Sequence, residues 1–170
     1  MDVFEAVRTL LAVRQYQDKP VPPDVVRRIA EAAHLTASGG NAQPWHFIVV
    51  QDRDTLRRLG AAARTGPYVA QAPLAVVVAI DRTPLAVSDA SRAIQSMMLA
   101  AWEEGVGSNW VGFLGSDQEA TKQLLGIPDN VDVLATIPFG YPARRVGRGK
   151  KQRKPFGEVV SDERFGQPLA

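Results

Sequence analysis

The chain contains no cysteine and only two histidines, His34 and His46. Disulfides, thiolate metal sites and a cysteine nucleophile are therefore excluded, and a metal site built from several histidines is not expected. The longest apolar run, Ala72 to Ile80, has nine residues, which is far too short to cross a membrane. The first 20 residues carry charges of both signs and do not resemble a signal peptide, so we expect a cytoplasmic protein.

Several catalytic motifs are missing as well. The nearest match to a dinucleotide-binding G-x-G-x-x-G motif begins at Gly105, but it places Trp110 where the third glycine belongs and follows a helix. There is no Walker loop, and neither histidine lies near a G-x-S-x-G sequence, so both are interpreted as structural. The adjacent carboxylates Glu103 and Glu104 are interpreted as a solvated helix end. Hydrolysis by side chains is therefore disfavoured.

What remains is the composition of one globular domain. Of 170 residues, 45% are hydrophobic and 22% are charged, values that argue against disorder. Helices and strands alternate without an internal repeat, which indicates a layered domain of mixed α and β structure. Capping and periodicity predict helices beginning at Asp2, Pro23, Asp52, Ser88–Asp89 and Ser116, and apolar runs predict strands over 47–50, 74–80, 106–113 and 131–137.

Positive charge is concentrated near the C-terminus. Seven of the 20 basic residues fall within positions 144–154, which contain no acid, while the rest of the chain carries 13 basic and 18 acidic residues. Lys151 and Arg153 share one side of an extended segment, a geometry that can clamp a phosphate group. A solvated basic tail explains the same residues slightly better, and a nucleic-acid patch ranks last because few aromatic residues are present to stack on bases.

The segment from Thr36 to Trp45 has the composition of a loop between a helix and a strand. Ser38, Asn41 and Gln43 offer neutral hydrogen-bonding groups, and Gly39 and Gly40 offer backbone N–H groups. Such a surface suits a planar polar ligand or a ribityl chain. From composition alone, an ordinary polar turn is the favoured interpretation.

Taken in order, these segments resemble the nitroreductase family of flavin enzymes over nearly the whole chain. The resemblance is carried by FEAVRTLLAVRQYQDKPVP (residues 4–22), TASGGNAQPWHFIVV (36–50), DASRAIQSMMLAAWEEGVGSNWVGF (89–113), IPFGYPA (137–143) and KKQRKPFGEVV (150–160). Each segment alone is weak, but five of them in the right order make a strong match.

The resemblance implies an α+β sandwich with a central, mostly antiparallel sheet flanked by helices. Residues 1–140 would form the core, and residues 141–170 would be a C-terminal extension that packs on the partner subunit of a homodimer. The family passes electrons from NADH or NADPH through FMN to nitro compounds, quinones or related small electrophiles by a ping-pong mechanism. No nucleic-acid or membrane partner is expected.

The resemblance also implies the cofactor contacts. Arg14, Lys151 and Arg153 would lie on the phosphate side of FMN, and the Val111–Gly112 backbone would approach the edge of its ring. The partner subunit would contribute a second set, consisting of Ser38, Gly39, Asn41 and Gln43. The flavin carries the chemistry in this family, so no catalytic side chain and no metal are implied.

This chain departs from the family pattern at two positions. Leu10 and Ala12 stand where the family usually has an arginine and a serine, so two phosphate or ring contacts are missing. The departure leaves open a non-catalytic protein that binds or sequesters flavin, or a change of cofactor. A nucleic-acid binder that uses residues 144–154 is a third hypothesis, whose binding would fall steeply with added salt.

Overall fold

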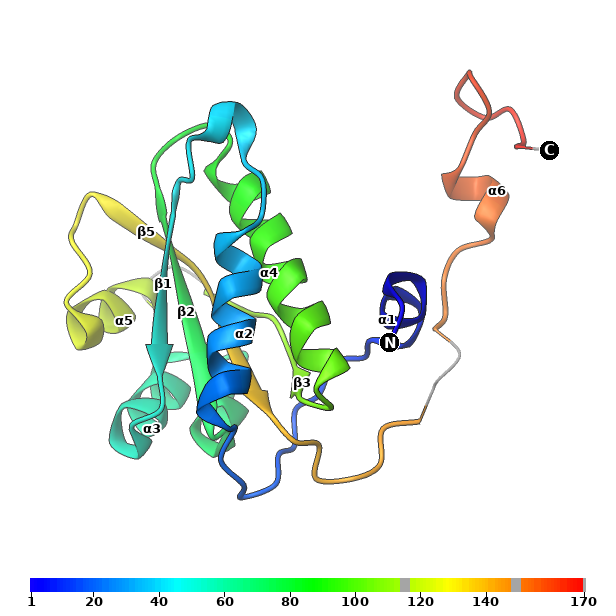
Figure 1. The fold of residues 1–170 in the computed structure, drawn as a ribbon. Helices are drawn as coiled ribbons and strands as arrows, with labels where there is room; N and C mark the ends of the chain where they lie inside the picture. The colour runs from blue at the N-terminus through cyan, green and yellow to red at the C-terminus, as the bar shows by residue number, and fades with distance from the viewer. Residues whose placement is uncertain (114–116, 148–150, 170) are drawn as a thin grey trace.

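A computed structural model describes residues 1–113, 117–147 and 151–169 (Figure 1). An antiparallel sheet lies at its centre, with strand order β1-β2-β5-β3 and with β4 also paired to β5. The strands are β1 (Trp45–Val50), β2 (Leu74–Asp81), β3 (Gly107–Ser108), β4 (Val111–Gly112) and β5 (Val131–Gly140). Every ladder between these strands is antiparallel, as the family resemblance implies.

Helices cover both faces of this sheet, so β2 is buried on both sides. Leu74, Val76, Val78 and Ile80 pack in one cluster with α2 (Pro23–His34) and α4 (Ala86–Glu103). Ala75, Val77 and Ala79 pack in a second cluster with α3 (Arg53–Ala62) and α5 (Asp117–Leu125). The prediction of a strand covered on both faces is confirmed, and the fold is an α+β sandwich.

Two predicted helix starts are also confirmed. The Asp2 side chain accepts the Glu5 N–H at 2.7 Å and caps α1 (Val3–Thr9), and Asp52 accepts the Thr55 N–H at 2.8 Å at the start of α3. Such caps satisfy N–H groups that have no partner within the helix. Helix α1 ends at Thr9, before the next apolar residues of the chain. The predicted cap at Ser116 falls outside the described residues.

The segment predicted as a single strand over 106–113 is instead divided into β3 and β4. The break falls at Asn109, whose side-chain amide donates to the Tyr68 hydroxyl and to the Trp110 carbonyl. Asn109 and Trp110 belong to neither strand. Strand β5 extends three residues beyond the predicted end, to Gly140, because Phe139 is fully buried opposite Leu74.

Two helices lie outside the sandwich. Figure 1 shows the chain leaving the body after β5, passing α1 and ending near α6 (Phe156–Val159). Phe4 is 76% exposed and Phe156 is 65% exposed, so both helices present apolar side chains to solvent. Two short 3₁₀ turns complete the structure, η1 (Gly39–Asn41) and η2 (Pro67–Gln71). None of the helices that the structure describes is long and apolar enough to span a membrane.

Candidate functional site

The loop between α2 and β1 holds an unusual backbone conformation. Asn41 and Gln43 have φ angles of 56° and 49°, and Gly40, which precedes Asn41, has a φ of 57°. Residues other than glycine rarely adopt this left-handed region, and strain of this kind clusters at functional sites. The loop holds its own shape, because the Ser38 hydroxyl accepts the Gln43 N–H at 2.9 Å and the Gln43 side-chain amide donates to the Asn41 carbonyl at 3.2 Å.

A buried carboxylate fastens this loop to α4. Asp89 is only 1% exposed; one of its oxygens accepts the Gly39 N–H at 3.0 Å, and the other is ion-paired with Arg92. A Cβ on Gly39 would meet the end of the exposed Leu85 side chain, which would have to move aside. A second link joins the loop to the same helix, since the Thr36 hydroxyl lies 2.8 Å from the hydroxyl of Ser96.

The prediction that Ser88 and Asp89 cap α4 is therefore wrong. The helix begins earlier, at Ala86, with Leu85 in the N-cap position. The Ser88 hydroxyl donates to the Leu85 carbonyl at 2.9 Å, and the Asp89 carboxylate binds the loop. A carboxylate in the first turn of a helix is favourable in either role, which is why the sequence alone did not separate them.

Arg14 lies on an extended segment that is pinned to the sheet. The Val13 N–H donates to the Ser108 carbonyl at 2.8 Å, and a Cβ on Gly107 would collide with Val13. The buried Tyr16 hydroxyl donates to the Val13 carbonyl at 2.6 Å, and its burial raises the pKa of Tyr16 far above the ordinary range. The backbone on both sides of Arg14 is thus fixed, while the guanidinium is exposed.

The chain that follows β5 runs beside this segment. The Ala143 N–H donates to the Gln15 carbonyl at 2.9 Å, and this pairing brings Arg144 and Arg145 next to Arg14. The three arginines and Ala12 line one open hollow of about 300 Å³. Sequence reasoning singled out Arg144 and Arg145 as basic residues but gave no reason to place them beside Arg14.

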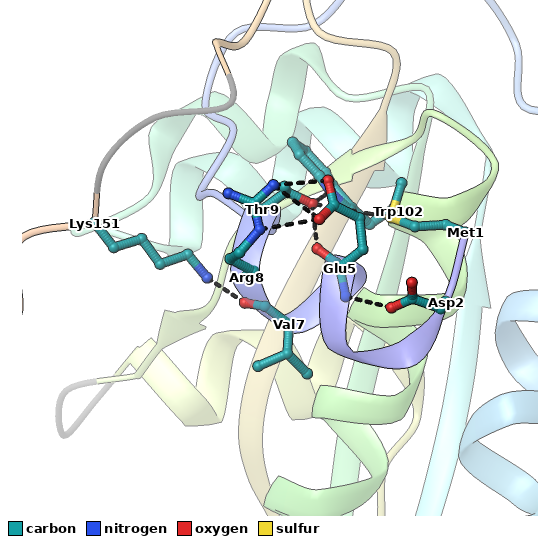
Figure 2. Close-up of polar contacts among 8 residues, drawn as sticks. All are labelled: Met1, Asp2, Glu5, Val7, Arg8, Thr9, Trp102 and Lys151. Carbon is teal, nitrogen blue, oxygen red and sulfur yellow. Dashed lines mark hydrogen bonds and ion pairs between the residues drawn. The ribbon is translucent and has the colours of Figure 1, made fainter.

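The other two predicted phosphate ligands lie near α1. Figure 2 shows the Lys151 ammonium donating to the Val7 carbonyl at 2.5 Å, in the last turn of that helix. Burial, and secondarily the charge of Arg153, lowers the pKa of Lys151. The Arg153 guanidinium donates to the Gln152 carbonyl at 2.8 Å. Within the described residues of one chain, no contact joins either cation to Arg14.

Strand β4 provides the predicted backbone site. Val111 is buried and pairs with Thr136 of β5, and Gly112 pairs with Ala135. The Gly112 carbonyl accepts a hydrogen bond from the Thr65 hydroxyl at 3.3 Å. Trp110, just before this strand, is 39% exposed. Its indole is therefore available beside Gly112 to a planar ligand.

The loop of Ser38 to Gln43 and the segment of Arg14 lie at opposite ends of the sheet, whereas Val111 and Gly112 lie level with the middle of β2. The loop joins the sheet at the far end of β2, where the Asp81 N–H donates to the Pro44 carbonyl at 3.2 Å. Ser108, which anchors the segment of Arg14, pairs with Phe139, and Phe139 pairs with Leu74 at the other end of β2. The rise per residue of a strand places the two ends of β2 roughly 20 Å apart. Figure 1 shows the loop between α2 and β1 at one end of the sheet and β3 at the other.

Comparisons with known proteins give this arrangement a context. The model of the nitroreductase family matches residues 11–85 and 68–141. The chain belongs to the nitroreductase family. It is 37% identical to an NADH dehydrogenase/NAD(P)H nitroreductase of Methanothermobacter thermautotrophicus, with 86% of this chain and 81% of that protein covered. A protein of the same description from Archaeoglobus fulgidus is 35% identical, with 96% and 93% covered.

Solved structures of the nitroreductase family share the fold. An FMN-dependent nitroreductase from Clostridium difficile R20291 superposes with a TM-score of 0.86 at 25% identity, and 96% of this chain and 100% of that chain are covered. The family model spans the sandwich from residue 11 to residue 141, and this structural match covers nearly the whole chain. The recognition made from five short sequence segments is confirmed.

Against this family background, the two departures can be located. Leu10 is half-buried at the end of α1, where its backbone N–H donates to the Ala6 carbonyl at 2.9 Å. Ala12 is exposed and lines the hollow of the three arginines. Sequence reasoning missed Asp89 as a loop anchor and the placement of Arg144 and Arg145. The clustering of basic residues was the only available signal for the latter pair.

Proposed function

We propose that this protein is an FMN-dependent oxidoreductase that passes electrons from NADH or NADPH to nitro compounds, quinones or related small electrophiles by a ping-pong mechanism. Relatives described as NAD(P)H nitroreductases and a structural neighbour described as an FMN-dependent nitroreductase support the reaction class. A homodimer and a cytoplasmic location are part of the same proposal.

The described residues fit a flavin mononucleotide. The loop of Ser38, Gly39, Asn41 and Gln43 presents neutral donors and acceptors on a backbone held in a strained conformation, which suits the ring and ribityl chain. Arg14 makes no ion pair within the described part of the chain, so its charge is available to a phosphate group.

One observation carries the proposal of a shared site. The loop and Arg14 lie at opposite ends of one sheet, so a single chain does not bring them to one ligand. A second copy would bring the loop of one subunit to Arg14 and β4 of the other. The exposed apolar side chains of α1 and α6 supply a surface for such an association.

The protein's part in the reaction is binding and orientation. When bound, FMN supplies a ring that accepts a hydride from the nicotinamide and passes electrons onward. The loop would hold the ring and ribityl chain, Arg14 with Lys151 and Arg153 would hold the phosphate, and the Val111–Gly112 backbone would face the ring edge. The exposed Trp110 would shield one side of the pocket from water. No side chain is assigned a proton-transfer step.

A visible absorption spectrum tests the proposal directly. The purified protein should bind FMN, the flavin absorbance should bleach with NADH or NADPH, and a quinone or nitroaromatic acceptor should restore it. Continuous NAD(P)H oxidation would rule out a protein that only stores flavin. A protein that neither contains nor binds FMN would overturn the proposal.

The phosphate contacts are tested separately. Lys151→Ala combined with Arg153→Ala should release bound FMN, because charge-assisted contacts to the phosphate dominate cofactor retention. Arg27→Ala combined with Lys154→Ala removes the same charge outside the predicted contacts and should leave flavin content unchanged. Equal flavin content in both double variants would show that Lys151 and Arg153 do not bind the phosphate.

A further inference from the structure

We infer that Arg144 and Arg145, together with Arg14, form a phosphate-monoester site in the hollow beside Ala12. This inference rests on the proposed function, because the expected ligand is the 5′-phosphate of FMN or the 2′-phosphate of NADPH. It adds two residues that the family resemblance does not assign, on the side of the sheet where two family contacts are missing.

The charge distribution around the hollow is the first argument. Most arginines of the body are neutralised by acids, as in the pairs Arg28–Glu104, Arg53–Asp18 and Arg82–Asp132. By contrast, Arg14, Arg144 and Arg145 make no hydrogen bond or ion pair within the described residues, and no acid lines the hollow. Three like charges around one space repel one another, and a dianion relieves that repulsion.

The backbone is the second argument, because it fixes where these charges lie. Residues 13–17 and 141–143 run antiparallel, with the Gln17 N–H donating to the Tyr141 carbonyl at 2.8 Å and the Ala143 N–H to the Gln15 carbonyl at 2.9 Å. The Gln17 side chain adds a bond to the Pro142 carbonyl at 2.9 Å. Arg14 and Arg144 are the immediate neighbours of the paired residues Gln15 and Ala143, so the backbone at both arginines is held in place.

The third argument is compensation. Ala12 stands where the family resemblance implies a serine, and its small side chain leaves the floor of the hollow open. Leu10, where an arginine is implied, is the C-cap residue of α1 and does not line the hollow. Arg144 and Arg145 add two cations beside Ala12 from the opposite segment. Guanidinium groups bind both carboxylates and phosphates through paired contacts, but three cations around one space match a dianionic phosphate better than a singly charged carboxylate.

The test compares ligands that differ only in a phosphate group. Dissociation constants for FMN and riboflavin are measured by fluorescence quenching in the wild-type protein and in the double variant Arg144→Gln, Arg145→Gln. We expect FMN to bind roughly 30-fold more weakly in the variant, as two charge-assisted contacts are lost, and riboflavin to bind equally well. The double variant Arg27→Gln, Arg58→Gln removes two exposed arginines elsewhere and should change neither constant.

The second arm identifies the other source of the phosphate. If the FMN constant is unchanged but the KM for NADPH rises and that for NADH does not, the hollow binds the 2′-phosphate of the reductant. If the variant alters neither the FMN-to-riboflavin ratio nor the NADPH-to-NADH ratio, the inference is overturned.

Failure of the proposed function gives a different result. A wild-type protein that binds neither flavin would refute FMN dependence, and the hollow would then be probed with AMP against adenosine. A preference for AMP that the double variant loses would support the phosphate site. Equal binding of both compounds would refute it.

Discussion

Helices α4 and α1 have apolar residues at the same spacing, but these residues are buried in α4 and exposed in α1. In α4, Ile94 and Met97 are three residues apart and almost fully buried; in α1, Phe4 and Val7 have the same spacing and are 76% and 50% exposed. The difference lies in what surrounds each helix. α4 packs on the sheet, whereas α1 is attached to the end of α4 by a bond from the Trp102 indole to the Thr9 hydroxyl (Figure 2).

This contrast teaches that an amphipathic pattern predicts a helix but not the partner of its apolar face. The sheet and the helices packed on it bury most of their large apolar side chains within one chain, although Leu35, Leu85 and Val87 stay exposed. Helices α1 and α6 do not, and in the proposed homodimer they would do so only against a second chain. Variants in the two regions should therefore fail in different ways.

The largest effect is expected in the body. Phe139→Ala removes a fully buried ring near the C-terminal end of β5 and should lower the free energy of unfolding by about 3–5 kcal/mol. Urea denaturation followed by circular dichroism measures this loss. Phe139→Leu keeps most of the volume and should cost much less. An Ala variant as stable as the Leu variant would show that this part of the core can collapse around the missing ring.

The next effect should appear in association. Phe4→Ser combined with Phe156→Ser should weaken dimerisation by roughly 100-fold, since each ring contributes apolar area that only a partner can cover. Sedimentation over a dilution series measures the constant. Phe4→Leu with Phe156→Leu keeps the apolar surface and should dimerise nearly normally. If the serine variant stays dimeric while the monomer unfolds more easily, these rings pack within their own chain instead.

A smaller effect is expected at the loop anchor. Asp89→Ala leaves the Gly39 N–H without its acceptor and should weaken both FMN and riboflavin binding by roughly tenfold, because an unpaired loop donor costs about 1–3 kcal/mol. Fluorescence titration measures both ligands. Asp89→Asn keeps an acceptor oxygen and should recover most of the affinity. Selective loss of FMN alone would mean that the loop contacts the phosphate rather than the ring.

The sequence was informative where a local pattern decides the structure. The apolar run of β2 predicted a strand buried on both faces, and Asp2 and Asp52 predicted helix starts, because these depend on neighbouring residues. Family resemblance supplied the sheet direction. The break between β3 and β4 falls at Asn109, whose side chain contacts Tyr68, 41 residues away, and no local pattern reports such a contact.

The candidate site shows the same limit. Ser38, Asn41 and Gln43 were found because their loop has a recognisable composition. Asp89 was misassigned because its partner, the Gly39 N–H, is 50 residues away. The position of Arg144 beside Arg14 depends on the pairing of two extended segments at opposite ends of the chain. Charge counting detected the basic segment but not its neighbour.

The two faces of β2 have a consequence for how the chain folds. One face carries larger side chains, including Leu74 and Ile80, and the other carries smaller ones, including Ala75 and Ala79, yet both are apolar. A slip of one residue would exchange the faces without exposing a polar group, so the pattern of polar and apolar residues does not determine this register. The register is instead determined by side-chain volume, together with the irregularity between Val78 and Ala79. We therefore expect a hairpin with the wrong register to be destabilised late in folding, when the helices pack on the sheet and the side-chain volumes do not match.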